Sequence, residues 1–174
     1  MQHWKSITLL TALLTLSGFS IDAQESGDTQ SPRTARAGTV SESVRTFMQT
    51  VAREVTQEGP SAWCRHFDTS QAFFMAVNGQ MAFPNGTAAQ EGTKNFARTI
   101  SHIELNWGDD LRVDPLTPQF AVVAASWHEV QVDHTGHRVD ESGYFTGLAQ
   151  YHNGSWFFRD AHWSQPVPPQ TPSH

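Results

Sequence analysis

The stretch from Val139 to Ser164 constrains the fold of this 174-residue chain more than any other. It consists of two runs rich in β-forming residues, joined by Asn153-Gly154. This dipeptide tolerates positive φ at both central positions of a type I′ turn and is the strongest short-range signal for a β-hairpin. The chain is therefore expected to end in a long antiparallel hairpin against which the preceding elements pack.

Side chains alternate between the two faces of a strand, so the second run of this hairpin predicts which residues lie together. At this period the residues that share one face are Trp156, Phe158, Asp160 and His162. A carboxylate and an imidazole beside two large aromatic rings suit a lined cavity better than a dry core. We therefore expect a pocket on this face, with Asp160 and His162 as the candidate catalytic pair.

Residues 1–23 have the pattern of a removable signal peptide. A short positive start precedes the apolar run Ile7–Phe19, and Ala23 offers a small residue at the cleavage position. The apolar run is shorter than the roughly 20 residues that a membrane span requires. We therefore expect a secreted or periplasmic protein with no membrane anchor after cleavage.

Composition separates one folded domain from two polar ends. Segment 24–38 is polar and lacks aromatic residues, which predicts a disordered leader. Segment 165–174 is rich in proline, which predicts an extended, disordered tail. A single domain is expected over residues 39–164, and it must fold without a disulfide because Cys64 is the only cysteine.

Charge and histidine spacing argue against several classes of partner. The chain has 11 basic and 17 acidic residues, a net charge of −6, and no basic cluster that would bind nucleic acid or an anionic membrane surface. The tightest group of histidines is His128, His134 and His137, and its spacing matches no known metal motif on a regular element. We expect neither a metal nor a cofactor.

Apolar periodicity and turn signals predict the order of the secondary-structure elements. A capping-box pattern at Thr39 opens a first amphipathic helix, which Gly59-Pro60 ends. A second short helix, a hairpin around Asn78-Gly79 and a third helix follow. Four long antiparallel strands complete the domain, so the fold class is α+β.

Three short motifs close the predicted domain: Gly143-Tyr-Phe-Thr-Gly147, Asn153-Gly154-x-Trp156 and His162-Trp163-Ser164. With the element order, they resemble the SnoaL-like and ketosteroid-isomerase-like domains of the nuclear transport factor 2-like (NTF2-like) superfamily over about Val40 to Ser164. The resemblance implies a cone-shaped, curved antiparallel sheet wrapped around three N-terminal helices, with a pocket at the open end. It also implies homodimers formed through the outer face of the sheet.

Only some of the catalytic residues of this family have a counterpart in this chain. Ketosteroid-isomerase-like members place a general-base carboxylate on the first hairpin, where this chain has the apolar run Ala72–Val77. They also use a tyrosine on the first helix, and Ser43–Glu58 contains none. SnoaL-type cyclases rely on an aspartate in the cavity, and the resemblance offers Asp160 for that role.

The chain carries a heavy load of aromatic residues for one small domain. Any one of them alone is better read as core, but together they match the lining of a pocket for a small hydrophobic molecule. Trp127 and Glu129 lie on one side of their predicted strand. The candidate ligand-binding residues are Trp63, Phe67, Phe73, Trp107, Trp127, Glu129, Phe145, Trp156 and Phe158.

Three functions are compatible with this pattern. The first is a secreted domain that binds a small hydrophobic molecule in an aromatic-lined pocket. The second is a cyclase, isomerase or hydratase that works through Asp160 and His162. The third is a dimeric interaction module that uses the outer face of the sheet and has no catalytic activity.

Overall fold

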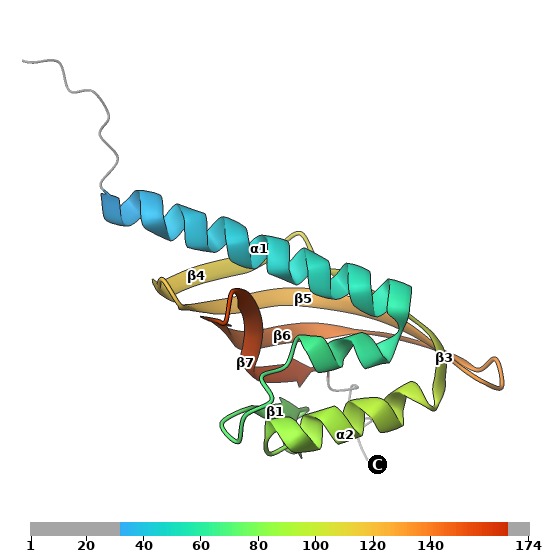
Figure 1. The fold of residues 1–174 in the computed structure, drawn as a ribbon. Coiled ribbons are helices and arrows are strands. Elements are labelled where there is room, and N and C mark those ends of the chain that lie inside the picture. Colours follow the sequence, from blue (N-terminus) through green and yellow to red (C-terminus); the bar gives the residue numbers. More distant parts are fainter. Residues whose placement is uncertain (1–31, 167–174) are drawn as a thin grey trace, which may run out of the picture.

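A computed structural model describes residues 32–166, with the backbone alone for residues 32–37 (Figure 1). The predicted signal peptide and most of the predicted leader and tail lie outside the described residues. The elements in chain order are α1 (Pro32–Glu58), the 3₁₀ helix η1 (Pro60–Arg65), β1 (Phe74–Val77), β2 (Gln80–Phe83), α2 (Gly86–Ala97), β3 (Ile100–Trp107), β4 (Arg112–Thr117), β5 (Phe120–Asp133), β6 (Arg138–His152) and β7 (Ser155–Ser164).

The strands form one curved sheet in the order β2-β1-β7-β6-β5-β3, and β4 pairs with the first half of β5 beside β3. The predicted α+β class and the curved sheet over helices are confirmed. The sheet is mixed rather than purely antiparallel, because β1 runs parallel to β7. The chain enters β1 from η1 rather than through a hairpin with β7, so no tight turn imposes an antiparallel direction.

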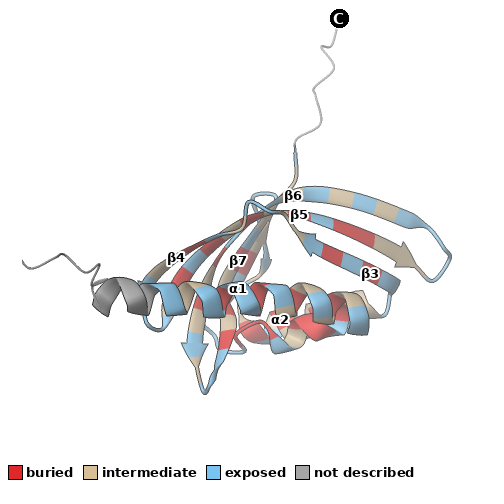
Figure 2. Cartoon of the chain, turned by 90° about the horizontal axis from the view of Figure 1, so that it is seen from above, coloured by how far each residue is buried: buried red, intermediate tan, exposed pale blue. Residues whose placement is uncertain are grey.

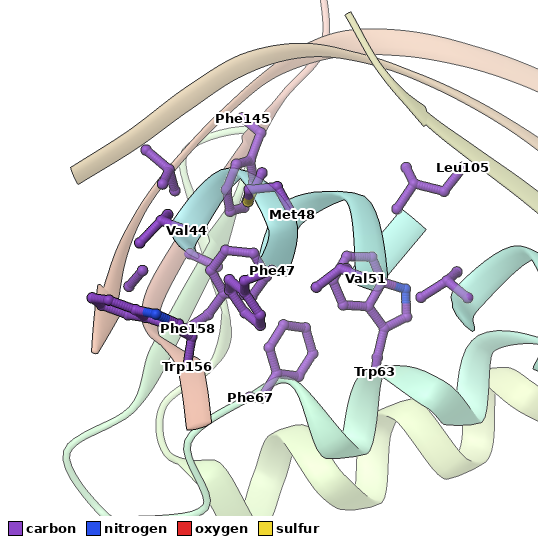
Figure 3. Close-up of a cluster of buried hydrophobic side chains, with 14 of the residues drawn as sticks. Val44, Phe47, Met48, Val51, Trp63, Phe67, Leu105, Phe145, Trp156 and Phe158 are labelled. Carbon is purple, nitrogen blue, oxygen red and sulfur yellow. The ribbon is translucent and has the colours of Figure 1, made fainter. Parts of the chain in front are cut away.

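The helices lie against the concave face of this sheet (Figures 1 and 2). The apolar stripe of α1 recurs at helical spacing, with Val44, Met48, Val51 and Val55 fully buried. Figure 3 shows part of this stripe packed against Phe145 and Phe158 of the sheet. Each fully buried side chain of this size contributes about 1.5–3 kcal/mol, so the stripe is what fixes α1 on the sheet.

Helix α1 begins earlier than the capping box at Thr39 predicts. It starts at Pro32, so residues 32–38 of the predicted leader belong to the helix. Proline is well tolerated in the first helical turn because its missing N–H would have no partner there. Once packing anchors the stripe from Val44 onward, each preceding residue adds one hydrogen bond, and alanine and arginine extend the helix at little cost.

The final hairpin forms as predicted, with positive φ at Asn153 and Gly154. The pairing of β6 with β7 contains a β-bulge, which the sequence pattern did not predict. The register shows it, since Ala149 pairs with Phe158 whereas Leu148 pairs with Asp160. Arg159 is the extra residue, and it reverses the alternation of side chains along β7. The predicted common face of Trp156, Phe158, Asp160 and His162 is therefore wrong.

The bulge lies where β7 changes partner on its other edge. Before it, the amide of Phe158 donates to the His66 carbonyl at 2.8 Å, and the amide of Asp68 donates to the Phe158 carbonyl at 2.9 Å. After it, Asp160 pairs with Phe74 of β1. The extra residue lets β7 pair in register with residues 66–68 before the bulge and with β1 after it. Neither of these two segments is adjacent to β7 in the sequence.

Close approach of two strands requires glycine at position 143. A Cβ on Gly143 would lie 1.8 Å from the Ser164 carbonyl oxygen, which is backbone and cannot rotate away. We expect Gly143→Ala to lower the free energy of unfolding by about 1–3 kcal/mol through overpacking. Urea denaturation measures this change.

Gly38 provides the matched substitution for this test. It lies in α1, and a Cβ added there would have no neighbour within 4 Å. Gly38→Ala should therefore stabilise the protein by up to about 1 kcal/mol, because alanine favours the helix. Equal effects of the two substitutions would contradict the proposed strand contact.

Candidate functional site

A cavity of about 380 Å³ lies between the sheet and the helices η1 and α2. We call it the aromatic pocket. Its volume is within the range of small-molecule sites, and most of its wall is aromatic or aliphatic. The residues that line it are Trp63, Phe67, Met75, Val77, Asn78, Phe83, Thr93, Phe96, Trp127, Glu129, Gln131, Glu141, Trp163 and Gln165.

Four of the nine predicted ligand-binding residues line this pocket. Trp63 and Phe67 come from η1 and the turn after it, and their rings stack with centroids 5.2 Å apart. Trp127 and Glu129 project from β5 on the same face, as the alternation along that strand predicts. The structure therefore brings together side chains that are at least 60 residues apart in the sequence.

The other five predicted ligand-binding residues do not line the pocket. They pack against one another, against α1 or against η1, and several are visible in Figure 3. Two of their indoles bond the sheet to α1: Trp107 Nε1 donates to the Met48 carbonyl and Trp156 Nε1 to Ser43 Oγ, both at 2.8 Å. The five residues are Phe73, Trp107, Phe145, Trp156 and Phe158.

Asp160 and His162 lie on the convex face, the side of the sheet that faces away from the helices. Asp160 Oδ1 accepts a hydrogen bond from the Leu148 amide at 3.0 Å, and partial burial raises the pKa of its carboxyl. His162 is exposed and pairs with Thr146. The sheet separates both residues from the aromatic pocket, so the predicted catalytic pair is not in the cavity.

The bulge brings Trp163 into the pocket in their place. Its ring centroid lies 5.6 Å from that of Trp63 and 5.4 Å from that of Trp127. Simple alternation from Trp156 assigns Trp163 to the opposite face, so sequence reasoning could not find it. Glu141 was also missed, although two-residue steps back from Phe145 along β6 lead to it.

Glu129 is the buried carboxyl of the pocket, with 9% of its surface exposed. Burial raises its pKa to about 7, an effect that a hydrogen bond from Gln131 Nε2 opposes and the charge of Glu141 reinforces. Glu129 and Glu141 are directly opposed across β5 and β6. The pocket therefore contains a carboxyl that changes charge near neutral pH, next to a second one.

The indole of Trp127 is the other polar group of interest. Its Nε1 is buried and has no hydrogen-bond partner within residues 32–166. Buried donors almost always have a partner, so this unpaired N–H is an exception among the described residues. It differs in this respect from the indoles of Trp107 and Trp156, which are bonded to α1.

The described residues contain no group of three or more His, Cys, Asp or Glu side chains placed to hold a metal ion. Within the same residues, no helix has the length and apolar character needed to cross a membrane. The side chains that line the pocket carry carboxyl, amide and hydroxyl groups and aromatic rings.

Solved structures of the NTF2-like superfamily have this fold. An NTF2-like superfamily protein from Salmonella enterica is 14% identical, with a TM-score of 0.60 over 79% of this chain and 96% of that one. A candidate scytalone dehydratase from Novosphingobium aromaticivorans is 12% identical, with a TM-score of 0.61 over 72% and 83%. A candidate aromatic ring hydroxylase from the same organism is 15% identical, with a TM-score of 0.62 over 80% and 94%.

These likenesses confirm the predicted NTF2-like fold. At such identities they establish the fold alone, because one fold supports many chemistries. No protein-family model matches the chain, and no curated protein matches it by sequence.

The raised pKa of Glu129 predicts a pH-dependent stability. Its folded pKa of about 7 lies above the ordinary value of 4.5, so its contribution is fully present below pH 4.5 and is lost as pH rises through 7. The loss amounts to about 3 kcal/mol at most. Urea unfolding between pH 4.5 and 8 should show Glu129→Gln gaining stability relative to the wild type as pH rises.

Glu91→Gln is the matched substitution, because Glu91 is an exposed carboxylate on α2. It should leave the pH dependence of stability close to that of the wild type. Carboxyl ¹³C NMR gives a direct second reading, and a titration midpoint of Glu129 below pH 5 would contradict the assigned pKa.

Proposed function

We propose that this domain binds a small, largely apolar molecule in the aromatic pocket. The observation that carries the proposal is a cavity of about 380 Å³ walled mainly by aromatic and aliphatic side chains. The cavity is open to solvent, so its apolar side chains stay in contact with water, and a ligand that covers them gains hydrophobic binding energy. Its few polar groups are placed to orient a ligand.

The carboxyls of Glu129 and Glu141 supply the polar contacts in this proposal. The carboxyl of Glu129 would donate a hydrogen bond when protonated and accept one when ionised. Together they favour a ligand with an apolar body and a small polar end.

The second candidate function is acid–base catalysis in the same pocket. A general acid or base works best when its pKa is near the working pH, and Glu129 meets this condition. Glu129 would then have the acid–base role that the sequence suggested for Asp160 and His162. In support, one protein of the same fold is named as a candidate scytalone dehydratase.

Filling the pocket tests ligand binding. Val77 lines the cavity from β1, so Val77→Phe would occupy space that the ligand needs. We expect affinity for small aromatic compounds, measured by calorimetry on a compound panel, to fall at least tenfold. That fall corresponds to about 1.4 kcal/mol.

Val122→Phe makes the same change on the convex face, where Val122 is 38% exposed. It should leave affinity for the pocket ligand unchanged. If no compound binds the wild type, or if both variants bind as the wild type does, the pocket is not the binding site.

We also propose that the protein is exported and forms a homodimer through the convex face. Three large apolar side chains are exposed there: Phe74 at 44%, Val122 at 38% and Tyr144 at 43%. Phe74 and Val122 belong to one row across the sheet, which also contains Asp160, Leu148 and Asp114. The N-terminal sequence of the exported chain, expected to begin at Gln24, tests the export proposal.

A charge in this row tests the dimer. Val122→Glu places a third carboxylate in a row that already contains Asp114 and Asp160, so sedimentation velocity should show a monomer where the wild type is a dimer. Gln119→Glu adds the same charge in the turn between β4 and β5 and should remain a dimer. A monomeric wild type would contradict the proposal, whichever way the variants behave.

A further inference from the structure

The aromatic pocket has an uneven charge balance. Among the described residues that line it, the only charged ones are Glu129 and Glu141, and none is lysine, arginine or histidine. A carboxylate in an apolar wall is screened far less than one in water. The interior of the pocket therefore favours positive charge.

The aromatic walls of the pocket also favour a positively charged ligand. Three indoles meet in the pocket: the ring planes of Trp63 and Trp163 are 90° apart, and those of Trp127 and Trp163 are 75° apart. Rings at these angles form walls around a corner rather than a flat stack. Aromatic faces carry negative electrostatic potential, and walls of this kind hold ammonium groups through cation–π attraction.

The opposed carboxylates make the empty pocket costly. Glu129 and Glu141 face each other directly across β5 and β6, where like charges destabilise the sheet. Glu129 is also buried without a cationic partner among the described residues. A neutral ligand would leave both costs in place, whereas a cationic ligand would offset them.

We propose that the ligand of the aromatic pocket is an organic cation, an amine or quaternary ammonium compound with an apolar substituent, held between the Trp63, Trp127 and Trp163 rings and the carboxylates of Glu129 and Glu141. This inference rests on the proposed binding function and names its ligand class. The apolar substituent fills the cavity, and the ammonium group neutralises the two carboxylates.

Cation binding is expected to depend on pH. A bound ammonium group favours the ionised form of Glu129, so affinity should rise as pH increases through about 7. Glu141 of β6 is the one other titratable group that faces Glu129 among the described lining residues, and those from η1, β1 and α2 are uncharged. The direction is opposite to that expected for a ligand that accepts a proton from neutral Glu129.

A matched pair of probes tests the charge preference. Phenyltrimethylammonium and tert-butylbenzene have nearly the same shape and differ in one positive charge. At pH 8 we expect the protein to bind the cation at least tenfold more tightly, measured by the change in tryptophan fluorescence or by ligand-observed NMR. Glu129→Gln and Glu141→Gln should each remove most of this preference.

Glu104→Gln separates a local effect from one of net charge. It removes the same charge from the outer face of β3 and should leave the preference intact. The two pocket variants should be at least as stable as the wild type at pH 8, because each removes one of two opposed carboxylates. Their loss of cation affinity therefore cannot be attributed to unfolding.

The results of these binding experiments test the organic-cation inference separately from the proposed binding function on which it rests. If tert-butylbenzene binds as tightly as the cation, or if the glutamine variants keep the preference, the organic-cation inference is overturned and hydrophobic binding stands. If neither probe binds, the inference is likewise overturned. The Val77→Phe comparison on the compound panel then decides the binding function separately.

Discussion

The β-bulge at Arg159 determines which side chains of the last strand reach the pocket. Without it, β7 would continue to present Asp160 and His162 to the helices. With it, Ala161 and Trp163 take those positions, and the two polar residues lie on the convex face. One extra residue thus exchanges a polar pocket wall for an aromatic one, and the ligand chemistry proposed for the site depends on that exchange.

Hydrogen bonding separates the structural tryptophans from those of the pocket. Trp107 and Trp156 donate their indole N–H groups to α1 and thereby fix the helix on the sheet. Trp127 belongs to the same sheet, yet its N–H has no partner in the described part of the chain. Since a buried indole normally finds an acceptor, this difference marks Trp127 as an indole whose hydrogen-bonding capacity the packing leaves unused.

The pocket carboxyls reduce the stability of the fold that holds them. Burial of Glu129 opposite Glu141 weakens the folded protein at neutral pH, and the apolar core around α1 compensates for that cost. Groups with strongly raised pKa values concentrate where proteins bind or transform other molecules. The buried charge at this end of the cone therefore supports the binding function that we propose for it.

The sequence by itself determined the α+β class, the two Asn-Gly hairpins, the apolar stripe of α1 and the common orientation of Trp127 and Glu129. These follow from local rules, because turn geometry and side-chain period act over a few residues. Only the tertiary structure decided the orientation of Asp160, His162 and Trp163. That orientation depends on the bulge, which forms because β7 must pair with residues 66–68 before it and with β1 after it, and pairing between segments so distant in the chain leaves no periodic signal in the sequence.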